Sequence, residues 1–264
     1  RCKTPTTRKE TEQWFFKITS YADQLLNNIP KLNWPKKITI AQQNWIGKTK
    51  GLNISFQVEE SDEKIVVWTK FWETVFGVTF LVVAPEHPIV ASLLNSKLKI
   101  SREAGSRPAG QDSRLNEIRE YVQKVLKKTD QKRKADEKDK TGIFTGIYAL
   151  NPVNGQKVPV WIADYVLTDV GTGAVMGVPS HDLRDFDFAK KYNLEVKHVV
   201  SYSDQDINAK VKNGRMAYEG EGVLVNSGEF DGLSAWGVGK QKMADWLVDK
   251  KFAEWKTTYH LRDW

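Results

Sequence analysis

The 264-residue sequence has little of what marks a secreted or membrane protein. It contains one cysteine, Cys2, so no disulfide can form within the chain, which is typical of the reducing cytoplasm. No apolar run approaches the roughly 18–20 residues that a membrane-spanning helix needs. The first residues show no signal-peptide pattern, and the sequence has no internal repeat. We therefore expect a cytoplasmic protein that has no membrane partner.

What the sequence does contain fits a globular chain with a basic surface. Hydrophobic residues make up 40% and charged residues 28%, and the length suits one large domain or a domain with appendages. The net charge of +7 is compatible with a polyanionic partner such as tRNA. Lysine and arginine are densest within residues 123–142. A solvated helix face is the simpler interpretation of such a cluster, so charge permits nucleic-acid binding without establishing it.

Helices are predicted near both ends of the chain. The first begins after Thr11 and carries Trp14, Ile18, Tyr21 and Leu25 on one face. A short second helix covers Ile38–Ile46 and stops at Gly47. The last covers Ala235–Lys250, before a strand at Thr257–Leu261.

The middle of the chain is rich in short β-type segments separated by Gly, Pro, Asn and Asp. These segments are Leu52–Val58, Lys64–Thr69, Val78–Val83, Gly142–Ala149, Val158–Asp164 and Gly173–Val178. Two helices are expected among them, one with Leu115, Ile118, Val122 and Val125 on its face and one over Asp182–Tyr192. Residues 101–113 are predicted to be a surface loop. The fold class is thus mixed α/β (α+β), a small, mostly antiparallel β-barrel or sheet surrounded by helices. Helical stems on both sides suit a domain inserted into a host protein.

The densest polar cluster, residues 179–187, follows a glycine-rich strand. Ser180 is the predicted N-cap, which brings Asp182 and Asp185 near the free N–H groups of the helix. These two acids share one helix face, and Arg184 is expected to reach a neighbouring element. A capped helix whose acids merely stabilise its dipole explains the same spacing.

Other chemistry is weakly supported for this cluster. A metal site made of His181, Asp182 and Asp185 would need a second histidine or cysteine nearby, which the sequence does not supply. His181 could act as a general base, although a lone histidine beside a cap is more often only a hydrogen-bonding residue. No Ser-His-Asp arrangement can be assembled. A hydrolase built on this cluster would therefore position water rather than form a covalent intermediate.

Several motifs in order along the chain carry a family resemblance. They are TGIFTG (141–146), WIADYVL (161–167) and GTGAVMGVPSHDLRDF (171–186), with FGVTFLVVAPEHP (76–88) before them. The flanks EQWFFKITSYADQLL, NWIGKTKG, GEGVLVNSGEFDGL and LRDW agree. Together these resemble the connective-peptide editing domain of leucyl-tRNA synthetases with its flanking stems. The resemblance implies an N-terminal stem at 1–46, an editing domain at 47–222 and a C-terminal stem at 223–264.

The resemblance also implies residue roles for hydrolysis of the ester in mischarged tRNA(Leu). Asp185 matches the aspartate that holds the α-amino group, and Thr74 matches the threonine that obstructs leucine. Met176 and Val178 would line the pocket, and His181, Asp182 and Arg184 would support it. An unperturbed Asp titrates near ~3.9, so Asp185 is predicted to be ionised. Cys2 resembles the last ligand of a zinc module, without the other ligands.

One segment departs from the family pattern. The usual Thr-Thr-Arg-Pro-Asp-Thr is here Thr69-Lys70-Phe71-Trp72-Glu73-Thr74. Thr69 and Thr74 remain, but Lys70 stands where the second threonine helps to hold the attacking water. Two alternatives to editing of tRNA(Leu) stay open: a weakly catalytic module that docks the tRNA 3′ end, and the insert of an isoleucyl- or valyl-tRNA synthetase. Editing needs no cofactor, and ATP, Mg and possibly Zn would belong to the aminoacylation core, the expected intramolecular partner.

Overall fold

The computed structural model describes residues 11–95, 98–100, 111–128, 133, 140–168 and 171–264. Cys2 and nearly all of the loop predicted at 101–113 lie outside these residues. The chain forms two compact units, one of residues 1–50 and 257–264 and one of residues 51–256. This division differs from the boundaries expected at 47 and 222. Residues 223–256 belong to the larger unit because helix α8 (Val238–Asp249) contacts the 3₁₀ helix η3 (Trp72–Gly77).

The smaller unit is built from short helices. They are η1 (Ile18–Tyr21), α1 (Ala22–Asn28), η2 (Ile29–Lys31) and α2 (Lys36–Ile46). Helix α2 ends at Gly47, whose φ of 57° is the left-handed conformation that favours glycine. The helix predicted after Thr11 is wrong at its start, since residues 11–17 are not helical. Trp14 is fully exposed, so this stretch buries no apolar face that could stabilise a helix.

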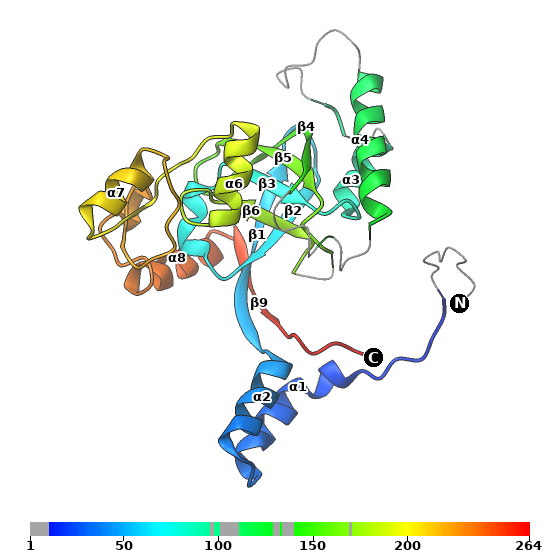
Figure 1. Ribbon diagram of the computed structural model, residues 1–264, viewed down its shortest axis with the longest axis vertical. Coiled ribbons are helices and arrows are strands. Elements are labelled where there is room, and N and C mark those ends of the chain that lie inside the picture. Colours follow the sequence, from blue (N-terminus) through cyan, green and yellow to red (C-terminus); the bar gives the residue numbers. More distant parts are fainter. Residues whose placement is uncertain (1–10, 96–97, 101–110, 129–132, 134–139, 169–170) are drawn as a thin grey trace. The chain divides into compact units, whose positions relative to one another are not determined.

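The larger unit is organised around a seven-stranded sheet in the order β2-β1-β4-β5-β3-β6, with β9 also paired with β1 (Figure 1). The strands are β1 (Thr49–Val58), β2 (Lys64–Thr69), β3 (Phe80–Val83), β4 (Gly142–Leu150), β5 (Lys157–Ala163), β6 (Ala174–Gly177) and β9 (Ala253–Thr258). All the pairs with a described register are antiparallel except β3 with β5. The two ends of the order, β2 and β6, contact each other, so the sheet curves toward a barrel as expected.

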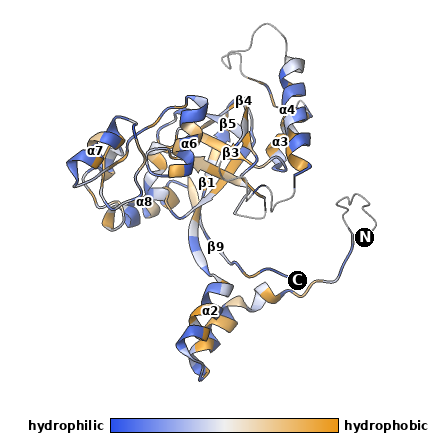
Figure 2. Ribbon diagram, in the orientation of Figure 1, coloured by the Kyte–Doolittle hydropathy of each residue, from blue (hydrophilic) through white to orange (hydrophobic). Residues whose placement is uncertain are grey.

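The strands form where the sequence predicted them because their apolar residues face the core. Leu52, Ile54, Phe56 and Val58 of β1 are buried at every second position, and β3 is buried throughout. Hydrophobic residues gather in the strands, whereas the surrounding helices carry both hydrophobic and hydrophilic residues (Figure 2). The predicted C-terminal strand begins four residues earlier than expected, at Ala253.

Helices surround this sheet. They are α3 (Pro88–Leu94), α4 (Gln111–Leu126), α6 (Leu183–Tyr192), α7 (Gln205–Lys212) and α8, with the short pair β7 (Val200–Ser201) and β8 (Val223–Leu224) and the 3₁₀ helix η4 (Gly228–Phe230). In α4 the predicted face of Leu115, Ile118, Val122 and Val125 is buried. Helix α3 lies beside α4 on one side of the sheet, and α6 lies in front of it in Figure 1. Among the described residues, no helix has both the length and the apolar character needed to cross a membrane.

Candidate active site

A cavity of about 530 Å³ lies in the larger unit and gathers most of the predicted site residues. Its walls come from the end of β2, from η3, from β6, from the start of α6 and from the segment after β5. The predicted residues among its lining are Thr69, Thr74, Met176, Val178, His181, Asp182, Arg184 and Asp185. Lys70 is exposed and is not part of the lining. The structure therefore brings together eight of the nine residues expected at the site and leaves Lys70 outside it.

Asp185 lies in the first turn of α6 and is 9% exposed. Its Oδ2 accepts a hydrogen bond from the backbone N–H of Val178 at 2.8 Å, which favours the charged form. Burial works against that charge, and the neighbouring Asp182 adds repulsion, so the pKa of Asp185 rises to about 8. The expectation that Asp185 is ionised was wrong, because it did not take the burial of the carboxyl group into account. A cationic group entering the cavity would restore the carboxylate.

The start of α6 is held by Asp182 and not by Ser180. Asp182 Oδ1 accepts hydrogen bonds from the backbone N–H groups of Arg184 at 2.8 Å and Asp185 at 3.1 Å. Ser180, the predicted N-cap, is fully buried, and its hydroxyl has no hydrogen-bond partner in the described part of the chain. Arg184 pairs with Asp182 at 3.3 Å instead of reaching a neighbouring element. The N-cap therefore lies two residues after the predicted position, at the residue whose carboxylate meets the two free N–H groups.

His181 is fixed as a neutral structural residue. Its Nε2 accepts backbone N–H groups from Val199 at 3.1 Å and Val200 at 3.2 Å. Its Nδ1 therefore carries the proton and donates to the Tyr202 hydroxyl at 2.7 Å, which in turn donates to the Tyr218 carbonyl at 2.6 Å. Burial, with His198 nearby, lowers the pKa of His181 to about 3. Because the lone pair of Nε2 already accepts these hydrogen bonds and Nδ1 carries the proton, His181 is not free to act as a general base or as a metal ligand.

The threonines at the two ends of the departing segment hold the segment's own backbone. Thr69 Oγ1 accepts a hydrogen bond from the N–H of Phe71 at 3.0 Å. Thr74 Oγ1 donates to the carbonyl of Phe71 at 2.8 Å, and Thr74 is 8% exposed. Both threonines thus fix the turn between β2 and η3, and Thr74 fills volume in the cavity wall.

Comparison with known proteins places these observations in a family. The model of the leucyl-tRNA synthetase editing domain matches residues 43–248. The chain belongs to this family. The leucine–tRNA ligase of Thermotoga maritima is 43% identical over 265 residues, which is 100% of this chain and 30% of that protein. The leucine–tRNA ligase of Dehalococcoides mccartyi strain CBDB1 is 45% identical over 267 residues, with the same coverage.

A solved structure agrees with this family. The Agrobacterium radiobacter K84 LeuRS-tRNA-LeuAMS ternary complex has a TM-score of 0.69 and 32% identity over 96% of this chain and 26% of its own chain. The chain thus spans less than a third of the length of the relatives it matches. The sequence resemblance to the family and the mixed, mainly antiparallel fold are confirmed.

The departing segment Phe71-Trp72-Glu73 contacts α8 through Lys240. The ammonium of Lys240 lies 3.2 Å and 3.1 Å from the two carboxylate oxygens of Glu73, which is 1% exposed. The same ammonium lies 5.2 Å from the ring centre of Phe71 and 4.7 Å from that of Trp72. Trp72 Nε1 donates to the Lys240 carbonyl at 2.8 Å, and Trp72 is not part of the cavity lining. We call these four residues the Lys240 cluster.

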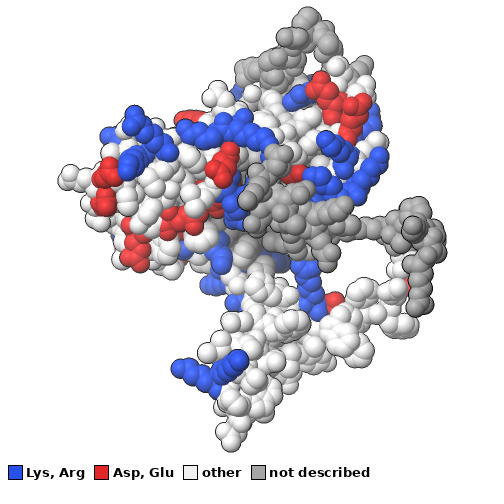
Figure 3. All heavy atoms as spheres, in the orientation of Figure 1, with Lys and Arg blue, Asp and Glu red and all other residues white. Residues whose placement is uncertain are grey.

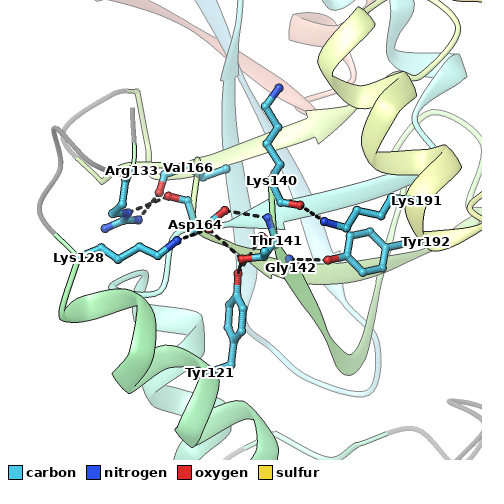
Figure 4. A network of polar contacts seen from close by, with 10 residues as sticks. All are labelled: Tyr121, Lys128, Arg133, Lys140, Thr141, Gly142, Asp164, Val166, Lys191 and Tyr192. Atoms are coloured by element: carbon cyan, nitrogen blue, oxygen red, sulfur yellow. Dashed lines mark hydrogen bonds and ion pairs between the residues drawn. The ribbon is translucent and has the colours of Figure 1, made fainter. Parts of the chain in front are cut away.

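The sequence analysis missed the residues that support the cavity wall after β5. Tyr165, Val166 and Leu167 line the cavity, and they follow Asp164, whose side chain is 5% exposed. The Asp164 carboxylate accepts the N–H of Thr141 at 3.0 Å, the Thr141 hydroxyl at 2.8 Å and the Lys128 ammonium at 3.1 Å (Figure 4).

Arg133 completes this network. It donates to the carbonyls of Asp164 at 2.8 Å and Val166 at 2.6 Å (Figure 4). It also pairs with Glu86 at 2.6 Å. Partners so far apart in the chain give no local sequence signal.

Proposed function

We propose that this chain hydrolyses the aminoacyl ester of tRNA(Leu) that carries isoleucine, valine or a norvaline-like amino acid. The observation that carries the proposal is that Asp185 and Thr74, more than a hundred residues apart, line one cavity. Asp185 offers a carboxyl group for the α-amino group, and Thr74 with Met176 and Val178 limits the space for the side chain. The rest of that wall is mostly apolar, which suits aliphatic amino acids.

Asp185 binds every aminoacyl ester through the same charge pair. A carboxylate about 4 Å from an ammonium gains roughly 4 kcal/mol at an effective dielectric of about 20. Discrimination then depends on shape, since a single methyl group contributes only about 1–3 kcal/mol in a binding pocket. Thr74 supplies that shape by occupying volume that the branched leucine side chain needs.

In the chemical step, water attacks the ester carbonyl carbon and the bond from that carbon to the ribose oxygen of the terminal adenosine breaks. The ribose oxygen leaves as a hydroxyl with the proton that the water loses. His181 has no free nitrogen to accept a proton, as described above. Lys70 does not line the cavity, so we assign it no role in holding the water. We propose that backbone N–H groups and a hydroxyl of the substrate's own ribose orient the water and stabilise the developing oxyanion.

The tRNA partner would be held by basic side chains on the surface of the larger unit. Figure 3 shows Lys and Arg gathered over α6 and α7, where Lys190, Lys191, Lys210 and Lys212 are exposed. Such residues neutralise phosphates and make binding sensitive to salt. The aminoacylation core of the same polypeptide is the second proposed partner, and ATP, Mg and Zn are proposed to act there and not in editing.

Deacylation of Ile-tRNA(Leu) by the purified chain tests this proposal. Asp185→Ala should reduce kcat/KM by at least about a hundredfold, because the ammonium loses its charged partner. Asp187→Ala is the matched control, since Asp187 is exposed on the same helix and does not line the cavity. It should keep the wild-type rate. Binding of tRNA(Leu) without hydrolysis of Ile-tRNA(Leu) would favour the docking module instead.

A further inference from the structure

Two exposed aromatic side chains lie at the same cavity. In the described part of residues 51–256, Phe71 is 51% exposed and Trp236 is 50% exposed. Every other phenylalanine, tyrosine and tryptophan of that part is buried or half-buried. Both residues line the cavity, although Phe71 directly precedes η3 and Trp236 lies in the segment before α8. Single exposed apolar residues are ordinary, but the presence of both at one opening calls for a ligand.

The burial of the lining residues shows which end of the cavity is the opening. Thr74 and Met176 are each 8% exposed and Asp185 is 9% exposed, so the predicted ester-binding residues form the closed end. The exposed fractions of Phe71 and Trp236 are about six times larger, so these two residues form part of the rim. An RNA whose terminal ester reaches the closed end must pass this rim with the nucleotides before its terminal adenosine.

We propose that Phe71 and Trp236 stack on the bases of the single-stranded nucleotides that precede the terminal adenosine of the substrate. The inference rests on the proposed function and adds residues that bind the RNA outside the reaction centre. Aromatic rings are common platforms for unpaired bases, and such stacking tolerates any base because every base has a flat π-face.

The ring of Phe71 is held in place before a base arrives. Its backbone N–H and carbonyl are bound by Thr69 and Thr74, as described above. The ammonium of Lys240 lies 5.2 Å from its ring centre and is itself paired with the buried Glu73. A platform that is already ordered loses less entropy when its ligand binds.

Steady-state deacylation with two substrates tests the inference. The first substrate is Ile-tRNA(Leu), and the second is the isoleucyl ester of adenosine, which lacks the preceding nucleotides. Phe71→Ala and Trp236→Ala should each raise KM for the tRNA about tenfold, the effect expected for losing one stacked base. KM for the adenosine ester should rise far less. Phe71→Tyr and Trp236→Phe should restore most of the affinity for tRNA.

Leu126→Ala is the matched control, because Leu126 is 48% exposed on α4 and does not line the cavity. It should leave KM for both substrates unchanged. An equal rise of KM for the tRNA and the adenosine ester would overturn the inference, since the rings would then contact the adenosine or the amino acid. Unchanged KM for the tRNA in the double variant would overturn it too.

A binding measurement separates this inference from the proposed function. If the wild type hydrolyses neither ester, the proposed function fails, and fluorescence anisotropy with a labelled RNA ending in ACCA still tests the stacking. The matched probe lacks the two bases before the terminal adenosine. The wild type should bind the intact probe about tenfold more tightly, and the double variant should bind both alike. Equal affinity of the wild type for the two probes would contradict stacking.

Discussion

The protonation of Asp185 links the cavity to pH. Because burial raises its pKa to about 8, Asp185 is mainly the neutral acid at pH 7. Binding an ammonium as an ion pair then requires the loss of one proton below pH 8, and above that pH the α-amino group, whose pKa is about 7.7–8.0, loses its own charge. We expect kcat/KM, corrected for spontaneous hydrolysis, to peak near pH 8 and to fall about tenfold per pH unit on the acid side. A flat profile between pH 6 and 8 would contradict this pKa.

The stability of the fold should also depend on pH through the protonation of Asp185. The folded protein raises the pKa of Asp185 above its unfolded value, so folding favours the protonated form. This contribution is fully present below about pH 4 and is lost as pH rises through 8. Asp185→Asn keeps the shape without the charge. In urea unfolding, the variant should therefore gain stability over the wild type as pH rises from 5 to 8.5, whereas a constant difference would argue against the shift.

Discrimination against leucine is a separate property of Thr74. Thr74→Ala should open space in the cavity wall, so that correctly charged Leu-tRNA(Leu) becomes a substrate while Ile-tRNA(Leu) is still hydrolysed. Relief of a steric clash can change the rate by more than the 1–3 kcal/mol that a methyl group contributes by binding. Initial deacylation rates on both tRNAs measure this. Thr79→Ala is the control, since Thr79 is also buried but does not line the cavity.

If Thr74→Ala hydrolyses Ile-tRNA(Leu) but leaves Leu-tRNA(Leu) intact, Thr74 is not the residue that excludes leucine. That role would then pass to Phe71, the aromatic residue of segment 69–74 that lines the cavity. Trp72 does not compete for that role, because its indole is turned to α8 by the hydrogen bond to the Lys240 carbonyl.

Between elements, the Lys240 cluster joins η3 to α8. Lys240→Met would leave the Glu73 carboxylate buried without its cation, a change that costs on the order of 3 kcal/mol of unfolding free energy. Burial raises the pKa of Glu73, so the carboxyl can take up a proton in acid and the cost should shrink as pH falls from 7.5 to 5. Urea unfolding at both pH values measures the difference. Lys242 is an exposed lysine of the same helix, so Lys242→Met should change the unfolding free energy little. Equal losses of stability in the two variants would contradict the ion pair.

Elements with a strong local pattern were predictable from the sequence, and long-range partners were not. Strand β2 was predicted residue for residue, because alternating apolar residues and flanking turns encode it locally. The cap of α6 was misplaced from Asp182 to Ser180, since both residues are good caps and only the folded chain decides between them. The raised pKa of Asp185 depends on its burial in the folded chain, which sequence spacing does not reveal. The hydrogen bonds to His181 Nε2 come from the segment at β7, which is equally invisible in the local sequence.

Across the whole molecule, the cavity belongs entirely to one of the two units. Its lining runs from Val67 to Trp236, within residues 51–256. The motifs that carry the family resemblance also lie mostly in this unit, and eight of the nine predicted site residues line its cavity. The predicted zinc ligand Cys2 lies outside the described residues and stays a prediction. Residues 223–256 group with the larger unit through contacts between η3 and α8, and elements so far apart in the chain give no local sequence signal.

This division leads to a prediction for the smaller unit, whose core is Ala22, Ile29, Ile46 and Leu261. Ile46→Ala should lower the stability of that unit by about 2–5 kcal/mol, because Ile46 is 4% exposed and its truncation leaves a cavity. Hydrolysis of the isoleucyl ester of adenosine should persist, since Ile46 does not line the cavity. Amide hydrogen exchange should show faster exchange in α1 and α2 while β3 and β5 stay protected. Ile40→Ala, on the exposed side of α2, is the control and should alter neither readout. Loss of protection in β3 together with loss of ester hydrolysis would show that the two units unfold as one.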